Sequence, residues 1–122
     1  MTDSTNSASE VTVVYLRTAS SHQADQDRNL QRQRRQCEDY ARRRGLQIVK
    51  TYVDAGVSGM SPRRPALDTM LRGLARQCAG SVLTADACRF ARDPRVRLAV
   101  QLDIARYGVL LRTADDGHET AN

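Results

Sequence analysis

The stretch VTVVYLRTASS, residues 11–21, decides how this chain is expected to fold. Its first seven residues are almost wholly apolar and rich in β-branched side chains, which is typical of a strand buried on both faces of a sheet. The run ends at Arg17, and small hydroxyl-bearing residues follow. A buried strand that ends in a cation and opens into a polar loop predicts a polar site at that end of the strand.

Strands and helices alternate along the rest of the chain. After the strand at 11–17, further strands are expected at 46–54, 80–85 and 109–113. Helices are expected at 27–44, from Pro65 onward, and from Pro94 to Gly108. This order predicts an α/β fold, with a mainly parallel sheet of about four strands and helices on both faces. We expect one domain at 11–114, a disordered tail at 1–10 and a loose tail at 115–122.

The cationic residues are almost all arginines. The 122 residues carry a formal net charge of +5, and all 19 cations except Lys50 are arginine. A guanidinium group matches phosphate oxygens in pairs, so this surplus favours a polyanionic partner, nucleic acid first. A solvated arginine-rich surface that binds nothing is the alternative.

Other features of the composition argue against a metal site, a cofactor and a membrane span. The three cysteines, Cys37, Cys78 and Cys88, show neither metal-ligand nor disulfide spacing, and the two histidines are isolated. We therefore expect no metal and no small-molecule cofactor. No apolar run reaches the length of a membrane span or of a signal peptide, so the sequence predicts a cytoplasmic protein without membrane contact.

Three loops should meet at one edge of the predicted sheet, because the carboxyl ends of parallel strands gather there. These loops supply Arg17 with Ser20 and Ser21, Ser58 with Arg63 and Arg64, and Arg89 with Arg92. Several arginines at one edge repel one another unless an anion lies among them, and a phosphate suits their geometry. The alternative is that each arginine pairs with a local acid, Asp54, Asp86 or Asp93.

The same segments carry a resemblance to a known family. The quoted motifs are YLRTASSHQ (15–23), NLQRQ (29–33), YVDAGVSGMSPRRPALDTML (52–71), CRFARD (88–93) and YGVLLRT (107–113). They resemble, in order and spacing, the motifs of serine recombinases, the resolvase/invertase group. The resemblance covers about residues 11–114 and implies the catalytic-domain fold of that family.

The resemblance also implies a chemistry. In the family, a serine two residues after the first arginine attacks a DNA phosphodiester, and religation follows strand exchange without metal or ATP. Arg17, Arg64, Arg89 and Arg92 match the arginines that stabilise the charge at phosphorus. Ser58 matches a supporting serine and Gln33 the helix glutamine. DNA is the implied partner, together with a second copy of the chain or another recombinase.

Two positions depart from the family pattern. Ala19 stands at the nucleophile's place, although Tyr15 and Gln23 remain in register, and a methyl group cannot attack phosphorus. Cys88 stands where the family has an aspartate, with Asp86 two residues earlier. Ser20 is the nearest remaining hydroxyl and would have to shift by one residue in the loop to attack.

Three hypotheses about function follow. The first is a serine-recombinase catalytic domain that binds DNA phosphate but cleaves weakly or not at all, so enzymatic activity stays open. The second is a catalytically inactive DNA-binding or regulatory module, and the third is a redox-sensitive domain acting through Cys88. Family members usually continue into a dimer helix and a DNA-binding region, so we expect a fragment, a truncated product or a stand-alone domain.

Overall fold

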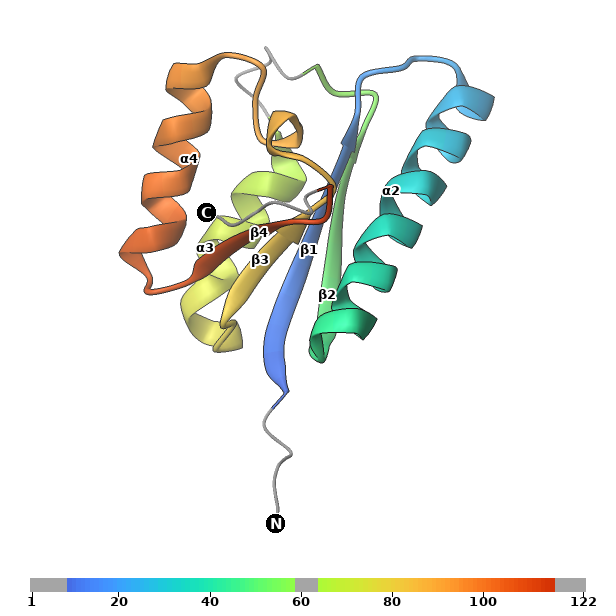
Figure 1. The fold of residues 1–122 in the computed structure, drawn as a ribbon. Helices are drawn as coiled ribbons and strands as arrows, with labels where there is room; N and C mark the ends of the chain where they lie inside the picture. Colours follow the sequence, from blue (N-terminus) through green and yellow to red (C-terminus); the bar gives the residue numbers. More distant parts are fainter. Residues whose placement is uncertain (1–8, 59–63, 116–122) are drawn as a thin grey trace.

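Strands and helices alternate through residues 9–58 and 64–115, the part of the chain that the computed structural model describes (Figure 1). The elements are β1 (Glu10–Thr18), α2 (Gln23–Arg44), β2 (Leu46–Ala55), α3 (Pro65–Gln77), β3 (Ser81–Thr84), the 3₁₀ turn η1 (Ala87–Arg89), α4 (Pro94–Arg106) and β4 (Leu110–Thr113). Of the tails expected at 1–10 and 115–122, residues 1–8 and 116–122 lie outside these ranges, and so does the loop residue Arg63.

The four strands form one parallel sheet in the order β2-β1-β3-β4. The central position of β1 explains its composition, because both of its faces and both of its edges are covered and every residue from Thr12 to Thr18 is buried. The α/β fold with a mainly parallel four-stranded sheet is therefore confirmed. All four carboxyl ends lie along one edge, as a parallel sheet requires.

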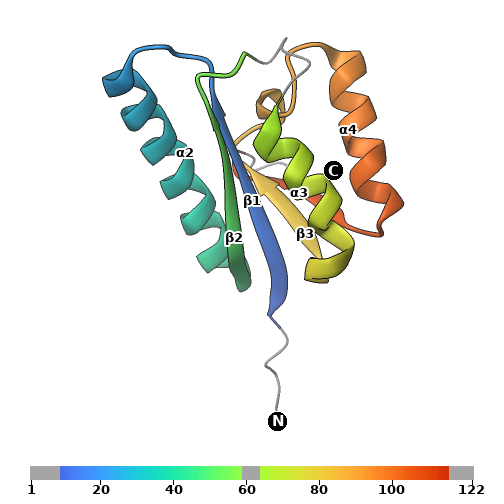
Figure 2. The same ribbon diagram turned by 180° about the vertical axis from the view of Figure 1, so that it is seen from behind.

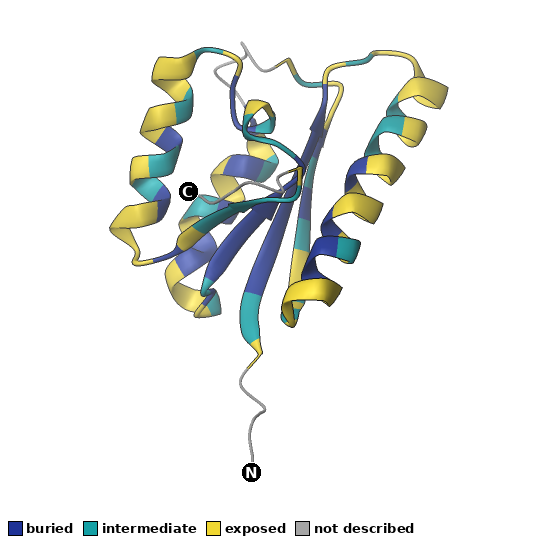
Figure 3. Cartoon of the chain, viewed as in Figure 1, coloured by how far each residue is buried: buried dark blue, intermediate teal, exposed yellow. Residues whose placement is uncertain are grey.

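Helices cover both faces of the sheet, α2 on one side and α3 with α4 on the other (Figures 1 and 2). Alternate residues of β1 supply the two cores. Val14 and Leu16 pack with Cys37 and Tyr40 of α2. The opposite core contains Val13 and Tyr15 and the buried side chains Tyr52, Leu67, Met70, Leu74, Val82, Phe90, Val100 and Ile104. Figure 3 shows the buried strands between the partly exposed helices.

One helix boundary differs from the sequence-based expectation. A loop was predicted through residue 26, but α2 already begins at Gln23. The backbone N–H of Gln26 donates to the His22 carbonyl at 2.9 Å, and its side-chain amide donates to the Ser20 carbonyl at 2.7 Å. These polar contacts form the first turn of the helix before its apolar stripe begins, so the apolar pattern placed the start one turn too late.

Within the described part of the chain, no helix combines the length and the apolar character that spanning a membrane requires.

Candidate functional site

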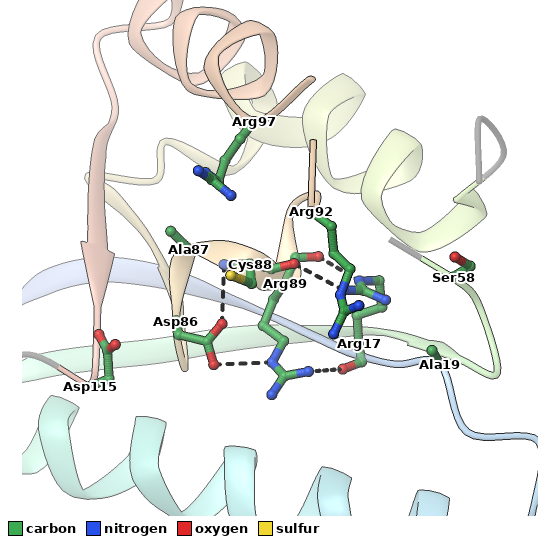
Figure 4. Close-up of a pocket in the computed structure, with 10 residues that line it drawn as sticks. All are labelled: Arg17, Ala19, Ser58, Asp86, Ala87, Cys88, Arg89, Arg92, Arg97 and Asp115. Carbon is green, nitrogen blue, oxygen red and sulfur yellow. Dashed lines mark hydrogen bonds and ion pairs between the residues drawn. The ribbon is translucent and has the colours of Figure 1, made fainter. Parts of the chain in front are cut away.

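A pocket of about 790 Å³ lies where the strands end. Loops from all four strands contribute to it, and so does the first turn of α4 (Figure 4). Its lining consists of Arg17, Ala19, Ser58, Asp86, Ala87, Cys88, Arg89, Arg92, Arg97 and Asp115. The predicted convergence of arginines therefore occurs, although not for every residue of the predicted set.

Arg17 is the buried centre of this arrangement, with 3% of its surface exposed. Its Nε donates to the carbonyl of Arg89 at 2.8 Å, Nη1 donates to that of Val57 at 2.9 Å, and Nη2 donates to that of Cys88 at 2.9 Å. One side chain of β1 thus ties together the loops that follow β2 and β3. None of these partners is a carboxylate, so the positive charge of Arg17 is not neutralised by them.

The surroundings of Arg17 carry further positive charge. Burial lowers the pKa of Arg17; Tyr15 opposes this, and the charges of Arg89, Arg64 and Arg92 lower the pKa further. A guanidinium whose pKa is lowered by three other guanidiniums lies in a field that attracts an anion. The predicted gathering of arginines around Arg17 is therefore present, and an anion among them stays a prediction.

Gln33 holds the backbone of Arg17 in place. Its side-chain oxygen accepts from the Arg17 N–H at 3.2 Å, and its amide nitrogen donates to the Arg17 carbonyl at 2.8 Å. The same nitrogen donates to Asn29 at 2.6 Å. Gln33 is buried. This glutamine of α2 therefore attaches the helix to the end of β1 and fixes the position of the Arg17 backbone.

Asp54 fixes the neighbouring loop in a similar way. Its carboxylate accepts hydrogen bonds from the backbone N–H groups of Ala66 at 2.9 Å and Leu67 at 3.1 Å, which lie in the first turn of α3. It also accepts from the Tyr15 hydroxyl at 2.8 Å. Burial, and then this bond to Asp54, raises the pKa of Tyr15. Asp54 therefore serves the fold, and its carboxylate joins β1, β2 and α3.

The third loop is held by an aspartate and an aromatic stack. Asp86 accepts from the Cys88 N–H at 3.1 Å and lies 3.3 Å from Nε of Arg89. That contact is an ion pair without hydrogen-bond geometry, since Nε has no hydrogen-bond partner in the described ranges. Phe90 stacks on Tyr15 with the ring centroids 5.8 Å apart. Asp86 thus reaches the site although it lies two residues before Cys88.

Two further arginines complete the lining. Arg92 is exposed, forms no ion pair with any carboxylate of the described residues, and reaches toward Arg17 (Figure 4). Arg97 of α4 is half-buried and donates to the Ala91 carbonyl at 3.3 Å. Arg97 was not predicted from the sequence as a site residue. The signal for it was its position in the first turn of a helix that starts at the same sheet edge.

Two predicted site residues lie outside the lining. The hydroxyl of Ser20 accepts from the His22 N–H at 3.3 Å, so it serves the turn before α2 while Ala19 faces the pocket. Arg64 precedes α3 and is 5% exposed. Its Nη1 has no hydrogen-bond partner among residues 9–58 and 64–115, and it lines a separate pocket of about 450 Å³. Arg64 contributes its charge to the site without lining it.

The cysteines differ in their surroundings. Cys88 is exposed and lines the pocket. Cys37 is buried, and burial raises its pKa to about 12, so it is a packing residue. In the described ranges, no group of three or more potential ligands among histidine, cysteine, aspartate and glutamate could hold a metal ion.

Comparison with known proteins places this geometry in a family. The family model described as Resolvase, N terminal domain, matches residues 12–122. A resolvase family site-specific recombinase from Streptococcus pneumoniae is 27% identical, with a TM-score of 0.78 over 91% of this chain and 76% of that one. No curated protein matches the chain.

Two other solved structures share the fold. The N-terminal catalytic domain of TP901-1 integrase has a TM-score of 0.79 and 23% identity, over 87% of this chain and 79% of that one. The C-terminal catalytic domain of ISC1926 TnpA, an IS607-like serine recombinase, has a TM-score of 0.75 and 24% identity, over 91% and 71%. At these identities the likeness is one of fold.

Proposed function

The chain belongs to the resolvase family, whose N-terminal domain it matches over residues 12–122, and from that premise we propose that it binds DNA phosphate in the strand-end pocket without efficient cleavage. The observation that carries the proposal is Ala19. Its methyl group lines the same pocket as Arg17, Arg89 and Arg92. The pocket therefore keeps the cations that would hold a phosphate and has a methyl group at the nucleophile's place.

Binding follows from the unmatched charge. Hydrogen bonds between a guanidinium and a phosphate oxygen are among the strong ones in proteins, and each phosphate bound releases counterions from DNA. Arg92 is the residue best placed to supply such bonds, because it is exposed and has no described carboxylate beside it. Ser58, which lines the pocket, is proposed as a hydrogen-bonding support, and Arg64 as a buried source of positive potential.

The binding test compares two arginines that differ only in place. Arg92→Gln removes a pocket charge, and Arg76→Gln removes a charge from the last turn of α3, beyond the opposite end of the sheet. We expect Arg92→Gln to weaken binding to a short duplex about tenfold and to lower the slope of log affinity against log salt by about 0.9. Arg76→Gln should change affinity less than about twofold. Equal effects of the two variants would contradict a pocket contact.

The cleavage test looks for a covalent protein–DNA adduct. The protein is incubated with supercoiled DNA and quenched with detergent, and we expect no adduct, because Ser20 is held in its turn and does not line the pocket. An adduct in Ala19→Ser would support the view that only the nucleophile is missing. An adduct formed by the unaltered chain and lost in Ser20→Ala would instead make Ser20 a nucleophile and the protein an active recombinase.

A protein partner is the alternative function, and one surface feature favours it. Leu98 and Leu102 of α4 lie one turn apart and are 55% and 56% exposed. Such a pair on a helix is suited to contact with a second copy of the chain or with another recombinase. A sedimentation experiment tests this, since Leu98→Glu should shift any oligomer toward the monomer and leave a monomer unchanged.

A further inference from the structure

The charges around the pocket do not cancel. Among the described residues, four arginines and two aspartates line it, which gives this part of the lining a surplus of two positive charges. Arg64 adds to this from behind, since its charge helps to lower the pKa of Arg17. A single negative charge would leave at least one guanidinium unmatched in a partly buried site. The ligand that neutralises the lining carries two negative charges or more.

The charges are also unevenly placed, for a reason of topology. Ala19 and Ser58 follow β1 and β2, which are neighbours at one side of the sheet, whereas Asp86 and Asp115 follow β3 and β4 at the other side. Figure 4 shows the two aspartates at one end of the pocket and Ala19 and Ser58 at the opposite end. The pocket thus has a cationic end, where Arg92 approaches Arg17. Opposite it lies an acidic wall of Asp115 and of Asp86, which is paired with Arg89 at 3.3 Å.

From these two features we propose that the pocket prefers a terminal phosphate monoester of a DNA strand to an internal phosphodiester, an inference that rests on the proposed phosphate-binding function. A monoester carries about 1.5 to 2 negative charges at neutral pH, which matches the surplus of two, and a diester carries one. Its strand also continues in one direction only. An internal phosphate is flanked on both sides by further phosphates, and one of these would meet the repulsion of Asp115, since Arg89 offsets the charge of Asp86.

Hydrogen bonding points the same way. A guanidinium has five N–H donors, of which Arg17 uses three on backbone carbonyls. Two donors of Arg17 are not used in these bonds, and the exposed Arg92 lines the same pocket. A terminal phosphate offers three free oxygens as acceptors, whereas an internal phosphodiester offers two. The monoester therefore satisfies more of the donors that the pocket brings together.

The test measures affinity by fluorescence anisotropy for three oligonucleotides of one sequence, with a 5′-phosphate, a 3′-phosphate or only hydroxyl ends, at fixed salt. We expect at least one phosphorylated strand to bind about tenfold more tightly than the hydroxyl strand at about pH 8. Arg92→Gln should remove that preference, and Arg76→Gln should keep it. Asp115→Asn should improve binding of the hydroxyl strand and so narrow the preference, because it weakens the acidic wall.

The pH response gives a second readout. The monoester loses one negative charge below its second pKa, about 6, so the preference should shrink as the pH falls through that value. The titratable groups facing this position are the four pocket arginines, Asp86, Asp115 and Cys88. If the loss of preference at about pH 6 comes from protonation of the phosphate, the Asp115→Asn variant will show the same loss. The affinity for a hydroxyl-ended strand will then not change through that pH range.

The outcomes separate this inference from the proposed function. If all three strands bind equally and Arg92→Gln weakens them all, the terminal-phosphate preference is wrong while DNA-phosphate binding stands. If Arg92→Gln affects none of them, both fail. A 5′-mononucleotide that competes as well as the phosphorylated strand would make the ligand a free nucleotide and overturn the assignment to a DNA end. Weaker competition from the mononucleotide and from inorganic phosphate would support it.

Discussion

The arginines of α2 and those of the strand-end pocket are the same residue type in opposite situations. On α2, Arg28 pairs with Asp25 and Arg42 with Asp39, each three positions apart on one helix, and the two arginine side chains are 72% and 71% exposed. In the pocket, Arg17 is buried and bonded to carbonyls, and Arg92 meets no described carboxylate. Water and local acids surround the first set, whereas in the second set only Arg89 has an ion pair with a described carboxylate, Asp86. The location of arginine, rather than its abundance, indicates the function.

Replacing the buried arginine should produce the largest change. Arg17→Met would leave the carbonyls of Val57, Cys88 and Arg89 without their donors, and we expect a loss of about 4 kcal/mol in the free energy of unfolding. Arg35→Met on the exposed face of α2 should cost less than about 0.5 kcal/mol. Urea denaturation measures both. Similar losses in the two variants would remove the distinction between the regions.

The support of Arg17 by α2 should rank second. Gln33→Leu removes both hydrogen bonds to the Arg17 backbone. The buried N–H loses its side-chain partner, and the carbonyl keeps only the 3.3 Å bond from Nη1 of Arg89. We expect the free energy of unfolding to fall by about 3 kcal/mol. Gln36→Leu, at an exposed position of the same helix, is the matched control. A change below about 1 kcal/mol for Gln33→Leu would mean that β1 holds its end without the helix.

Breaking the partly buried ion pair between Arg112 and Glu10 should have an intermediate, pH-dependent effect on the free energy of unfolding. Arg112 of β4 donates two bonds of 3.0 Å to Glu10, and this bonding lowers the pKa of Glu10 against the opposing effect of burial. A lowered folded-state pKa stabilises the fold above the usual value of 4.5, and this contribution disappears as the pH falls through the lowered pKa.

Glu10→Gln should therefore cost about 1 kcal/mol at neutral pH and nothing in strong acid, where the carboxylate of the unaltered chain is protonated as well. Urea denaturation across the acid range measures the difference between the two proteins. A difference that persists unchanged in strong acid would show that packing, and not the charge of Glu10, supplies the stabilisation.

The smallest effect is expected on the exposed face of α2. Arg42→Gln should change the free energy of unfolding by less than about 0.5 kcal/mol, because solvent screens a pair whose arginine and aspartate side chains are 71% and 46% exposed. The difference should vanish at high salt, since screening removes it. A loss comparable with that of Glu10→Gln would contradict the ranking by burial.

Much of the fold followed from short patterns. The apolar run at 11–17, the alternation of elements, and helix-starting prolines such as Pro65 and Pro94 predicted the parallel sheet, because these signals depend on residues close together in the chain. The start of α2 was placed too late, since polar contacts between Ser20, His22 and Gln26 leave no apolar stripe.

The candidate site could be predicted only in outline. The rule that strand ends meet brought Arg17, Ser58, Arg89 and Arg92 to one edge. It could not separate Ala19, which lines the pocket, from Ser20, which does not, because the direction of a side chain in a loop depends on local hydrogen bonds. It also could not place Arg64 behind the pocket or Arg97 within it, since both depend on how a helix packs against the sheet.

The amino-acid order alone indicated which residues end the strands and that these ends are rich in arginine. It also predicted that Ala19 occupies the nucleophile's position. What each arginine meets depends on the folded chain. The carbonyls that bind Arg17 lie 40 to 72 residues away from it. Every residue has a backbone carbonyl, so such partners leave no mark in the sequence. Only the packing of the folded chain distinguishes the buried Arg17, which joins two loops, from the exposed Arg92.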